Sequence, residues 1–202
     1  GDARFEHLTF AHYGRPGRDL YSRVTLGYLE RMYAGVSAEL LYQPVDSWWG
    51  VGVEVNHVWS REFDGLFGLR DYSVTTGHVS GYFDLGDDFE AQVDVGRYLA
   101  GDWGATFSVD RVFANGWRVG AFATFTDVSF DDFGEGSFDK GVRLTIPLAW
   151  TLGNTTREAN NAVLRPTFRD GGARLEVQGR LHDIVTDYHR PRLEDTQGVI
   201  WR

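Results

Sequence analysis

Apolar and polar residues alternate along much of the chain. Between positions 49 and 59 one alternate set is mainly apolar and has an aromatic ring at each end: Trp49, Val51, Val53, Val55, His57 and Trp59. The intervening positions are small or polar, apart from the last: Gly50, Gly52, Glu54, Asn56 and Val58. Because successive strand side chains point to opposite faces, this segment predicts a strand with one apolar face and one polar face.

The same alternation recurs and predicts ten or eleven strands in total. The clearest further segments are 32–42, 89–96, 105–110, 141–150 and 173–181, with weaker ones near 3–13, 20–30, 72–85, 117–127 and 161–169. Short turn sequences separate several of them, at Gly86–Asp88, Asn115–Gly116 and Asp170–Gly172. We expect consecutive strands to pair as antiparallel hairpins across these turns.

The connections differ in length in an ordered way. The longer ones cover about 60–71, 100–103 and 127–139. In a chain of consecutive hairpins these three fall on one rim, and the turns at 86–88 and 114–116 fall on the other. Short turns on one rim and long loops on the other are typical of outer-membrane barrels.

Two architectures agree with the alternation. A soluble β-sandwich or lipocalin-like barrel would turn its apolar face inward, whereas a membrane barrel turns it outward. The Gly, Ser and Thr content of the polar faces, and the Trp or Tyr at the ends of the apolar ones, favour the membrane barrel. No apolar run approaches the roughly 18 residues of a membrane helix. We therefore predict an all-β, antiparallel up-and-down transmembrane β-barrel of about 10–12 strands.

The amino-acid composition limits the kinds of binding partner and metal site that the protein can have. The 202 residues include no Cys, which excludes disulfides and thiolate metal sites, and carry a formal charge of −9. This charge argues against a nucleic-acid partner, because phosphate binding needs a clustered basic face. It suits a surface that meets cations, neutral sugars or basic partners, and also one whose charge serves only solubility.

Several long and unusual strings resemble the YjbH family of outer-membrane proteins, which accompanies exopolysaccharide production in Gram-negative bacteria. They are Gly27–Gly35, Phe63–Tyr72, Thr76–His78 and the stretch from Gly96 to Gly141. The resemblance implies an outer-membrane location in a Gram-negative bacterium and no established catalytic activity. It also implies lipid, lipopolysaccharide, exopolysaccharide and other envelope or export proteins as partners.

The resemblance also bears on domain organisation. Family members are several times longer, so we expect this chain to correspond to a C-terminal portion, with further wall strands missing or supplied by another chain. Residues 1–181 are then assigned to the barrel. The polar tail, 182–202, is expected to lie outside the wall as a plug or periplasmic segment.

Charged and amide residues on the polar faces are expected to face the lumen, where they either pair and close it or line a polar passage. They are Glu54, Asn56, Glu90, Gln92, Asp94, Arg143, Arg174 and Glu176.

Two hypothetical sites lie on the predicted long loops. Aromatic rings beside carboxylates suit glycan contact, and the set proposed for it is Asp64, Phe67, Asp102, Trp103 and Asp131. Trp103 fits an interfacial aromatic girdle as well. Carboxylates that could ligate Ca²⁺ are Asp131, Asp132, Glu135 and Asp139, although their spacing is not that of an EF-hand and a solvated, internally hydrogen-bonded loop explains them better. No other cofactor is expected.

Catalytic motifs are not recognisable. The six histidines have no accompanying nucleophile motif, and no phosphate-cradling loop is visible. We therefore expect a protein without enzymatic activity that assists exopolysaccharide export or surface assembly, as a conduit or a scaffold. The alternatives are a purely structural or interaction barrel and an outer-membrane enzyme that acts on glycans or lipids.

Overall fold

The computed structural model describes residues 6–62, 67–113, 115–129, 138–147, 159–166 and 171–187. These contain ten strands and one helix. The elements are β1 (Leu8–Gly17), β2 (Leu20–Tyr28), β3 (Tyr33–Tyr42), β4 (Trp49–Arg61), β5 (Leu69–Gly86), β6 (Phe89–Arg97), β7 (Trp103–Val112), β8 (Arg118–Thr126), β9 (Asp139–Pro147), β10 (Ala159–Leu164) and α2 (Leu181–Asp187).

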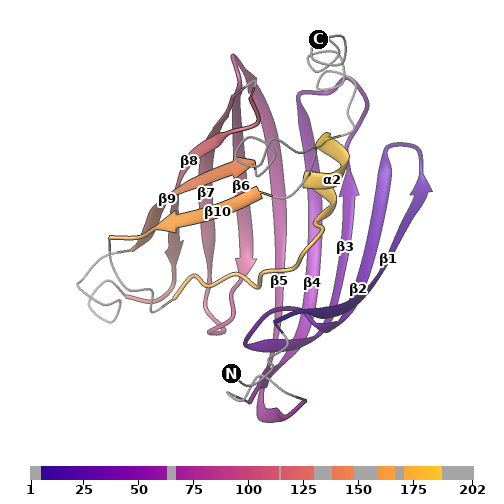
Figure 1. The fold of residues 1–202 in the computed structure, drawn as a ribbon, viewed down its shortest axis with the longest axis vertical. Helices are drawn as coiled ribbons and strands as arrows, with labels where there is room; N and C mark the ends of the chain where they lie inside the picture. Colours follow the sequence, from indigo (N-terminus) through magenta and orange to yellow (C-terminus); the bar gives the residue numbers. More distant parts are fainter. Residues whose placement is uncertain are drawn as a thin grey trace.

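The strands form one antiparallel sheet in which each strand pairs with the next along the chain, from β1 to β10. The sheet curls around a concave face, and β1 and β10 form its two edges (Figure 1). The predicted up-and-down order and the strand number are confirmed. The sheet is not closed, because no pairing joins β1 to β10 within the described residues.

The convex face of the sheet is apolar and the concave face is polar, which is the opposite of a soluble β-sandwich, whose apolar face is turned inward. On the convex face, strand register aligns one apolar row: Leu40, Val53, Val79, Val95, Ala105 and Phe125. Val53, Val79 and Val95 are 44%, 52% and 53% exposed. The neighbouring concave-face positions are polar and buried, including Glu54, which is 2% exposed. Apolar side chains therefore point away from the protein and polar ones point into it.

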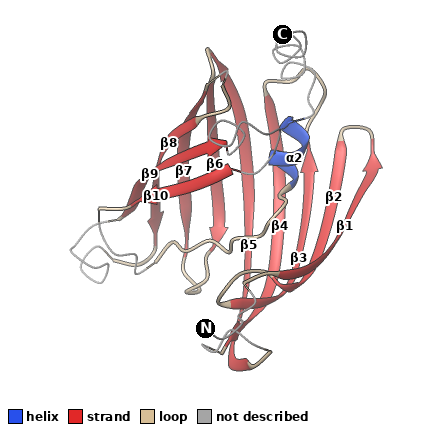
Figure 2. Cartoon of the chain, viewed as in Figure 1, coloured by secondary structure: helices blue, strands red, loops and turns tan. Residues whose placement is uncertain are grey.

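Residues 171–187, here called the inner segment, cross the concave face of the sheet (Figure 1). Residues 172–177 have no regular secondary structure, and α2 follows, in contact with β2 and β3 (Figure 2). The strand predicted over 173–181 is thus wrong. Its apolar residues alternate because Leu175, Val177 and Leu181 pack against the sheet, and among the described residues no strand pairs with this segment. Of the predicted tail, 182–202, the structure describes only the part within α2, and its role as a plug or periplasmic segment stays a prediction.

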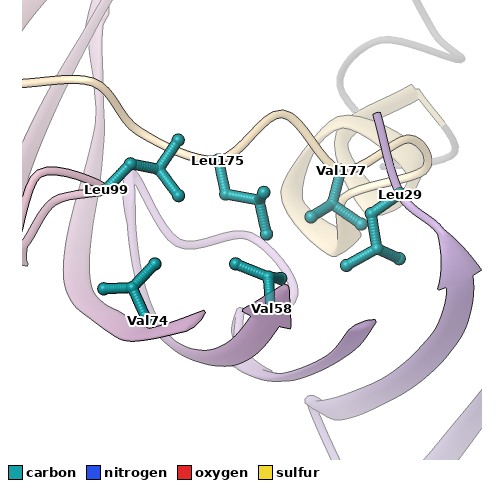
Figure 3. Packing of buried hydrophobic residues seen from close by; sticks show 6 residues of the cluster. All are labelled: Leu29, Val58, Val74, Leu99, Leu175 and Val177. Atoms are coloured by element: carbon teal, nitrogen blue, oxygen red, sulfur yellow. The ribbon is translucent and has the colours of Figure 1, made fainter. Parts of the chain in front are cut away.

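The inner segment is packed by two small apolar clusters. In the first, Leu175 and Val177 meet Leu29, Val58, Val74 and Leu99 from the sheet and its connections (Figure 3). In the second, Leu181 of α2 packs against Leu41 and Tyr82. Leu29, Leu41, Val58 and Leu175 are fully buried. The buried apolar core therefore lies between the inner segment and the concave face.

The predicted short turn at Gly86–Asp88 connects β5 to β6. Asp87 and Asp88, between β5 and β6, have φ values of 51° and 68°, and the preceding Gly86 has a φ of 75°. Glycine and aspartate tolerate these left-handed conformations better than most residues. Among the described residues, no helix is both long enough and apolar enough to cross a membrane.

Candidate functional site

The concave face carries a row of ionisable side chains that strand register brings together. Arg23 on β2 lies opposite Glu39 on β3, Glu39 lies opposite Glu54 on β4, and Glu54 lies opposite His78 on β5. All four are at most 6% exposed. Because neighbouring strands alternate in step, one polar position on each strand is enough to build a continuous buried row.

Glu54 is the centre of this row. Its carboxylate lies 3.4 Å from Arg23, 3.6 Å from Arg174 and 3.2 Å from Arg180, measured between nitrogen and oxygen. Two of these arginines belong to the inner segment and one to the wall. The carboxylate therefore holds the inner segment to the sheet through a charge-assisted hydrogen bond from Arg180 and an ion pair with Arg174.

Asp94 on β6 provides the second ionic anchor. Arg174 Nη1 donates to Asp94 Oδ1 at 2.6 Å, and Ser80 Oγ donates to the same oxygen at 2.5 Å. Burial disfavours the charge of Arg174, but Asp94 and Glu54 outweigh that cost and raise the pKa of its guanidinium. Burial and the nearby charge of Arg174 lower the pKa of Arg180. An arginine remains charged under these conditions, so both are cations within the protein.

The start of α2 is held by Glu39. The backbone N–H of Leu181 donates to both carboxylate oxygens of Glu39, at 3.2 Å and 3.1 Å. The ring of His182 stacks on Tyr82 of β5 with centroids 3.7 Å apart and an interplanar angle of 6°. A wall carboxylate and a wall aromatic ring thereby fix the helix in place.

The other end of the inner segment is tied to the loop between β6 and β7. Gly172 N–H donates to Asp102 Oδ2 at 2.8 Å, and Leu99 N–H donates to the carbonyl of Ala173 at 2.9 Å. Further along, Glu176 N–H donates to Glu30 Oε2 at 3.0 Å. The segment is thus anchored at its beginning, middle and end.

A polar cavity of about 410 Å³ remains on the other side of the inner segment, towards β8, β9 and β10. Wall residues that line it include Phe122, Asp139, Arg143 and Arg165. Glu176 and Asp183 line it from the inner segment. The inner segment therefore packs against residues of β2–β6 and the β6–β7 loop, and the cavity lies towards β8–β10.

The residues predicted to face the lumen lie as follows. Glu54, Asn56 and Asp94 are buried on the concave face, and Gln92 donates to Asp94 at 2.9 Å. Glu90 pairs with Arg118 at 3.0 Å, and Arg143 lines the cavity. Arg174 and Glu176 belong to the inner segment and not to a wall strand.

The predicted glycan set is not brought together among the described residues. Phe67 packs against Tyr28 with ring centroids 5.9 Å apart. Asp102 is buried and bonded to the inner segment, a position that does not suit glycan contact at a rim. Trp103, the first residue of β7, is 61% exposed on the convex side with Ala105 and Phe107, and its place in an aromatic girdle stays a prediction. Asp64 and Asp131 lie outside the described residues.

The predicted Ca²⁺ ligands are mostly beyond the described residues as well. Asp131, Asp132 and Glu135 fall there, while Asp139 is 2% exposed and pairs with Arg165 at 3.1 Å. In the part of the chain that the structure describes, no three His, Asp or Glu side chains converge as metal ligands. The Ca²⁺ site stays an untested prediction.

Several interior residues were not singled out from the sequence. Arg23 and Glu39 are each a single charge on the polar face of a predicted strand, which is the signal that could have identified them. Arg180 was assigned to a wall strand. Its convergence with Arg174 on Glu54 depends on how the inner segment folds back, which strand alternation does not encode.

The geometry defines a class of protein: an open, antiparallel up-and-down β-sheet with an apolar convex face, whose polar concave face is crossed by residues 171–187. The chain belongs to the YjbH family, described as "exopolysaccharide biosynthesis protein YbjH", whose family pattern matches residues 1–187. It is 37% identical over 191 residues to the "uncharacterized lipoprotein YjbH" of Escherichia coli (strain K12).

That match covers 92% of this chain and 27% of the relative, so the chain spans about a quarter of the relative's length. The family is described as linked to exopolysaccharide biosynthesis, and the E. coli relative is described as a lipoprotein. No solved structure matches this chain significantly.

Proposed function

We propose that this chain forms part of the wall of a β-barrel in the outer membrane. The barrel assists exopolysaccharide export or surface assembly without catalysing a reaction. The observation that carries the membrane part is the polarity of the sheet: valines on its convex face are exposed while its concave face is ionic and buried. Lipid is the solvent that stabilises such an outer face, and lipopolysaccharide and outer-membrane lipid are then its neighbours.

Closure of the wall belongs to this proposal. β1 and β10 pair only with β2 and β9 among the described residues, and a strand edge left open in a bilayer is costly. The edges are completed by strands from elsewhere in a longer polypeptide or from a second chain. The length of the E. coli relative supports the first of these sources.

The exopolysaccharide part rests on the family, and other envelope or export proteins are the expected partners. Two roles remain for the wall. The cavity beside β8–β10 favours a conduit for an extended polymer. The ionic anchoring of the inner segment favours a closed scaffold, because the segment occupies the interior beside β2–β6.

Single-channel conductance of the full-length protein in a planar bilayer tests the proposal, with and without the exopolysaccharide from the same bacterium. Stable openings that the polysaccharide blocks support the conduit. Insertion without openings supports the scaffold. Protein that stays folded in plain buffer and does not insert contradicts the membrane wall altogether.

A further inference from the structure

The wall side of the cavity contains two arginines that are built in the same way. Arg143 Nη2 lies 2.8 Å from Asp110 Oδ2, and Arg165 Nε lies 3.1 Å from Asp139 Oδ1. The two carboxylate side chains are only 7% and 3% exposed, whereas the guanidinium side chains are 36% and 32% exposed. Each arginine is thus ion-paired to a buried acid and lines the cavity with its partly exposed guanidinium; of the two acids, Asp139 also lines the cavity and Asp110 does not.

Glycines in the wall make this arrangement possible. Gly120 lies between Asp110 and Arg143 in the strand register. The Asp110 carboxylate occupies the space that a Cβ at Gly120 would fill, so the ion pair spans β8 from β7 to β9. Such a bridge two strands wide cannot form over a larger residue.

Phe122 lies between the two cations. Its ring covers Gly141, where a Cβ would lie 2.8 Å from the ring edge. The guanidinium carbons of Arg143 and Arg165 lie 5.8 Å and 5.0 Å from the ring centroid. Cation–π contact orients both groups around one aromatic ring, which makes a fixed pair of donors within the cavity.

This lining matches the chemistry of an acidic carbohydrate. Guanidinium groups bind carboxylates through two parallel hydrogen bonds. On the facing inner segment, Glu176 and Asp183 are exposed acids, and carboxylates can accept hydrogen bonds from sugar hydroxyls. The volume of about 410 Å³ lies within the range of roughly 300–1,000 Å³ typical of ligand sites.

We propose that the cavity between the inner segment and β8–β10 binds a segment of carboxylate-bearing polysaccharide, with Arg143 and Arg165 gripping its carboxylates. The site rests on the proposed role in exopolysaccharide export or assembly and adds to it the acidic class of saccharide and its contacts. It also assigns the saccharide to the interior of the wall and not to a rim.

The test is binding of a hexamer of galacturonate to the purified full-length protein in detergent, with maltohexaose as the neutral counterpart. The hexagalacturonate binds and maltohexaose binds at least about tenfold more weakly, because only the former offers carboxylates to the arginines. Replacing both arginines, R143Q with R165Q, weakens hexagalacturonate binding at least about tenfold. The R118Q variant is the control: Arg118 is 31% exposed and ion-paired to Glu90, but it does not line the cavity.

A second measurement does not disturb the ion pairs. Val163 lines the cavity, and residues 1–202 contain no Cys, so a Val163→Cys variant adds one thiol to this part of the protein, and any Cys outside it is replaced beforehand. Hexagalacturonate slows labelling of this thiol by a maleimide, and maltohexaose does not.

Equal binding of both hexamers, hexagalacturonate binding that survives R143Q with R165Q, or labelling that hexagalacturonate does not slow would each overturn the acidic-saccharide site. In those cases protein that still inserts into bilayers leaves the proposed membrane wall in place. Failure to insert contradicts the wall itself, and the hexamer measurements in detergent then decide the site separately.

Discussion

Glu54 shows how much of the interior depends on one residue, because three guanidinium groups converge on its buried carboxylate. A buried carboxylate is costly to desolvate and is tolerated only where it is paired. Here the cations come from β2 and from the inner segment, so that the same charge joins two parts of the fold.

The E54Q variant therefore loses stability. Three arginines keep their charge while the shared acid is gone, and removing one partner of a buried pair costs about 3–5 kcal/mol of unfolding free energy. Urea unfolding in lipid vesicles, followed by tryptophan fluorescence, measures it. E90Q is the control, since Glu90 and Arg118 are 24% and 31% exposed and such a pair contributes at most about 1 kcal/mol. Equal losses would contradict the central role of Glu54.

Gly120 leaves room for the Asp110–Arg143 ion pair that crosses β8. A G120V substitution places side-chain atoms where the Asp110 carboxylate lies and separates it from Arg143. We expect the crowding to lower the unfolding free energy by about 1–3 kcal/mol. A121V, on the opposite face of β8, enlarges an exposed position and should change stability by less than about 0.5 kcal/mol. If G120V is as mild as A121V, the bridge across Gly120 is absent.

At the scale of elements, the inner segment is a unit separate from the wall. Its contacts with the sheet are side-chain packing, ion pairs and a few hydrogen bonds, whereas the strands share a continuous ladder. Units with fewer backbone hydrogen bonds open more readily than the sheet around them.

Leu175 tests this separation. It is fully buried against Leu99 and Val58, so an L175A variant loses packing worth about 2–5 kcal/mol. Hydrogen exchange should accelerate at amides 172–187 and leave the strand amides unchanged. L69A, at a position that is 51% exposed, serves as the control. Faster exchange throughout β4–β6 in L175A would mean that the wall and the inner segment unfold together.

The strands of the sheet are predictable from the sequence, whereas the fold of the inner segment is not. Alternation located ten strands, including the weak segments that became β1 and β10, because each strand imposes a period of two on its own residues. The same period in 173–181 predicted a strand that does not exist, since packing over a concave surface also buries alternate side chains. Strand alternation predicted which strand residues lie on the polar face. It could not predict that Arg174 and Arg180 pair with them, because that depends on how the inner segment folds back over the sheet.

At the scale of the whole molecule, the convex face sets the environment. Val79 lies near the middle of β5 in the exposed apolar row, so V79R has different consequences in water and in lipid. In a bilayer the arginine costs about 2–4 kcal/mol near the midplane. In a water-exposed protein the same change costs no more than about 0.5 kcal/mol.

A substitution near the end of the same strand is the control for V79R, because it would lie nearer the membrane surface. Leu85 is 58% exposed at the end of β5, next to the turn, and L85R should cost only about 0–1 kcal/mol near an interface. Unfolding in vesicles measures both variants. A V79R cost no greater than that of L85R would argue against a membrane-embedded middle for β5.

The most direct test of the membrane wall is a nitroxide scan along β5 in lipid vesicles. Residues 1–202 contain no Cys, so once any Cys elsewhere in the full-length protein is replaced, single cysteines from Val74 to Tyr82 can be labelled one at a time. We predict that collisions with dissolved oxygen peak at the convex-face positions 75, 77, 79 and 81, while a water-soluble nickel reagent is excluded from Val79. If the nickel reagent reaches Val79 as readily as it reaches a label at the exposed turn residue Asp87, the convex face meets water and the account is wrong.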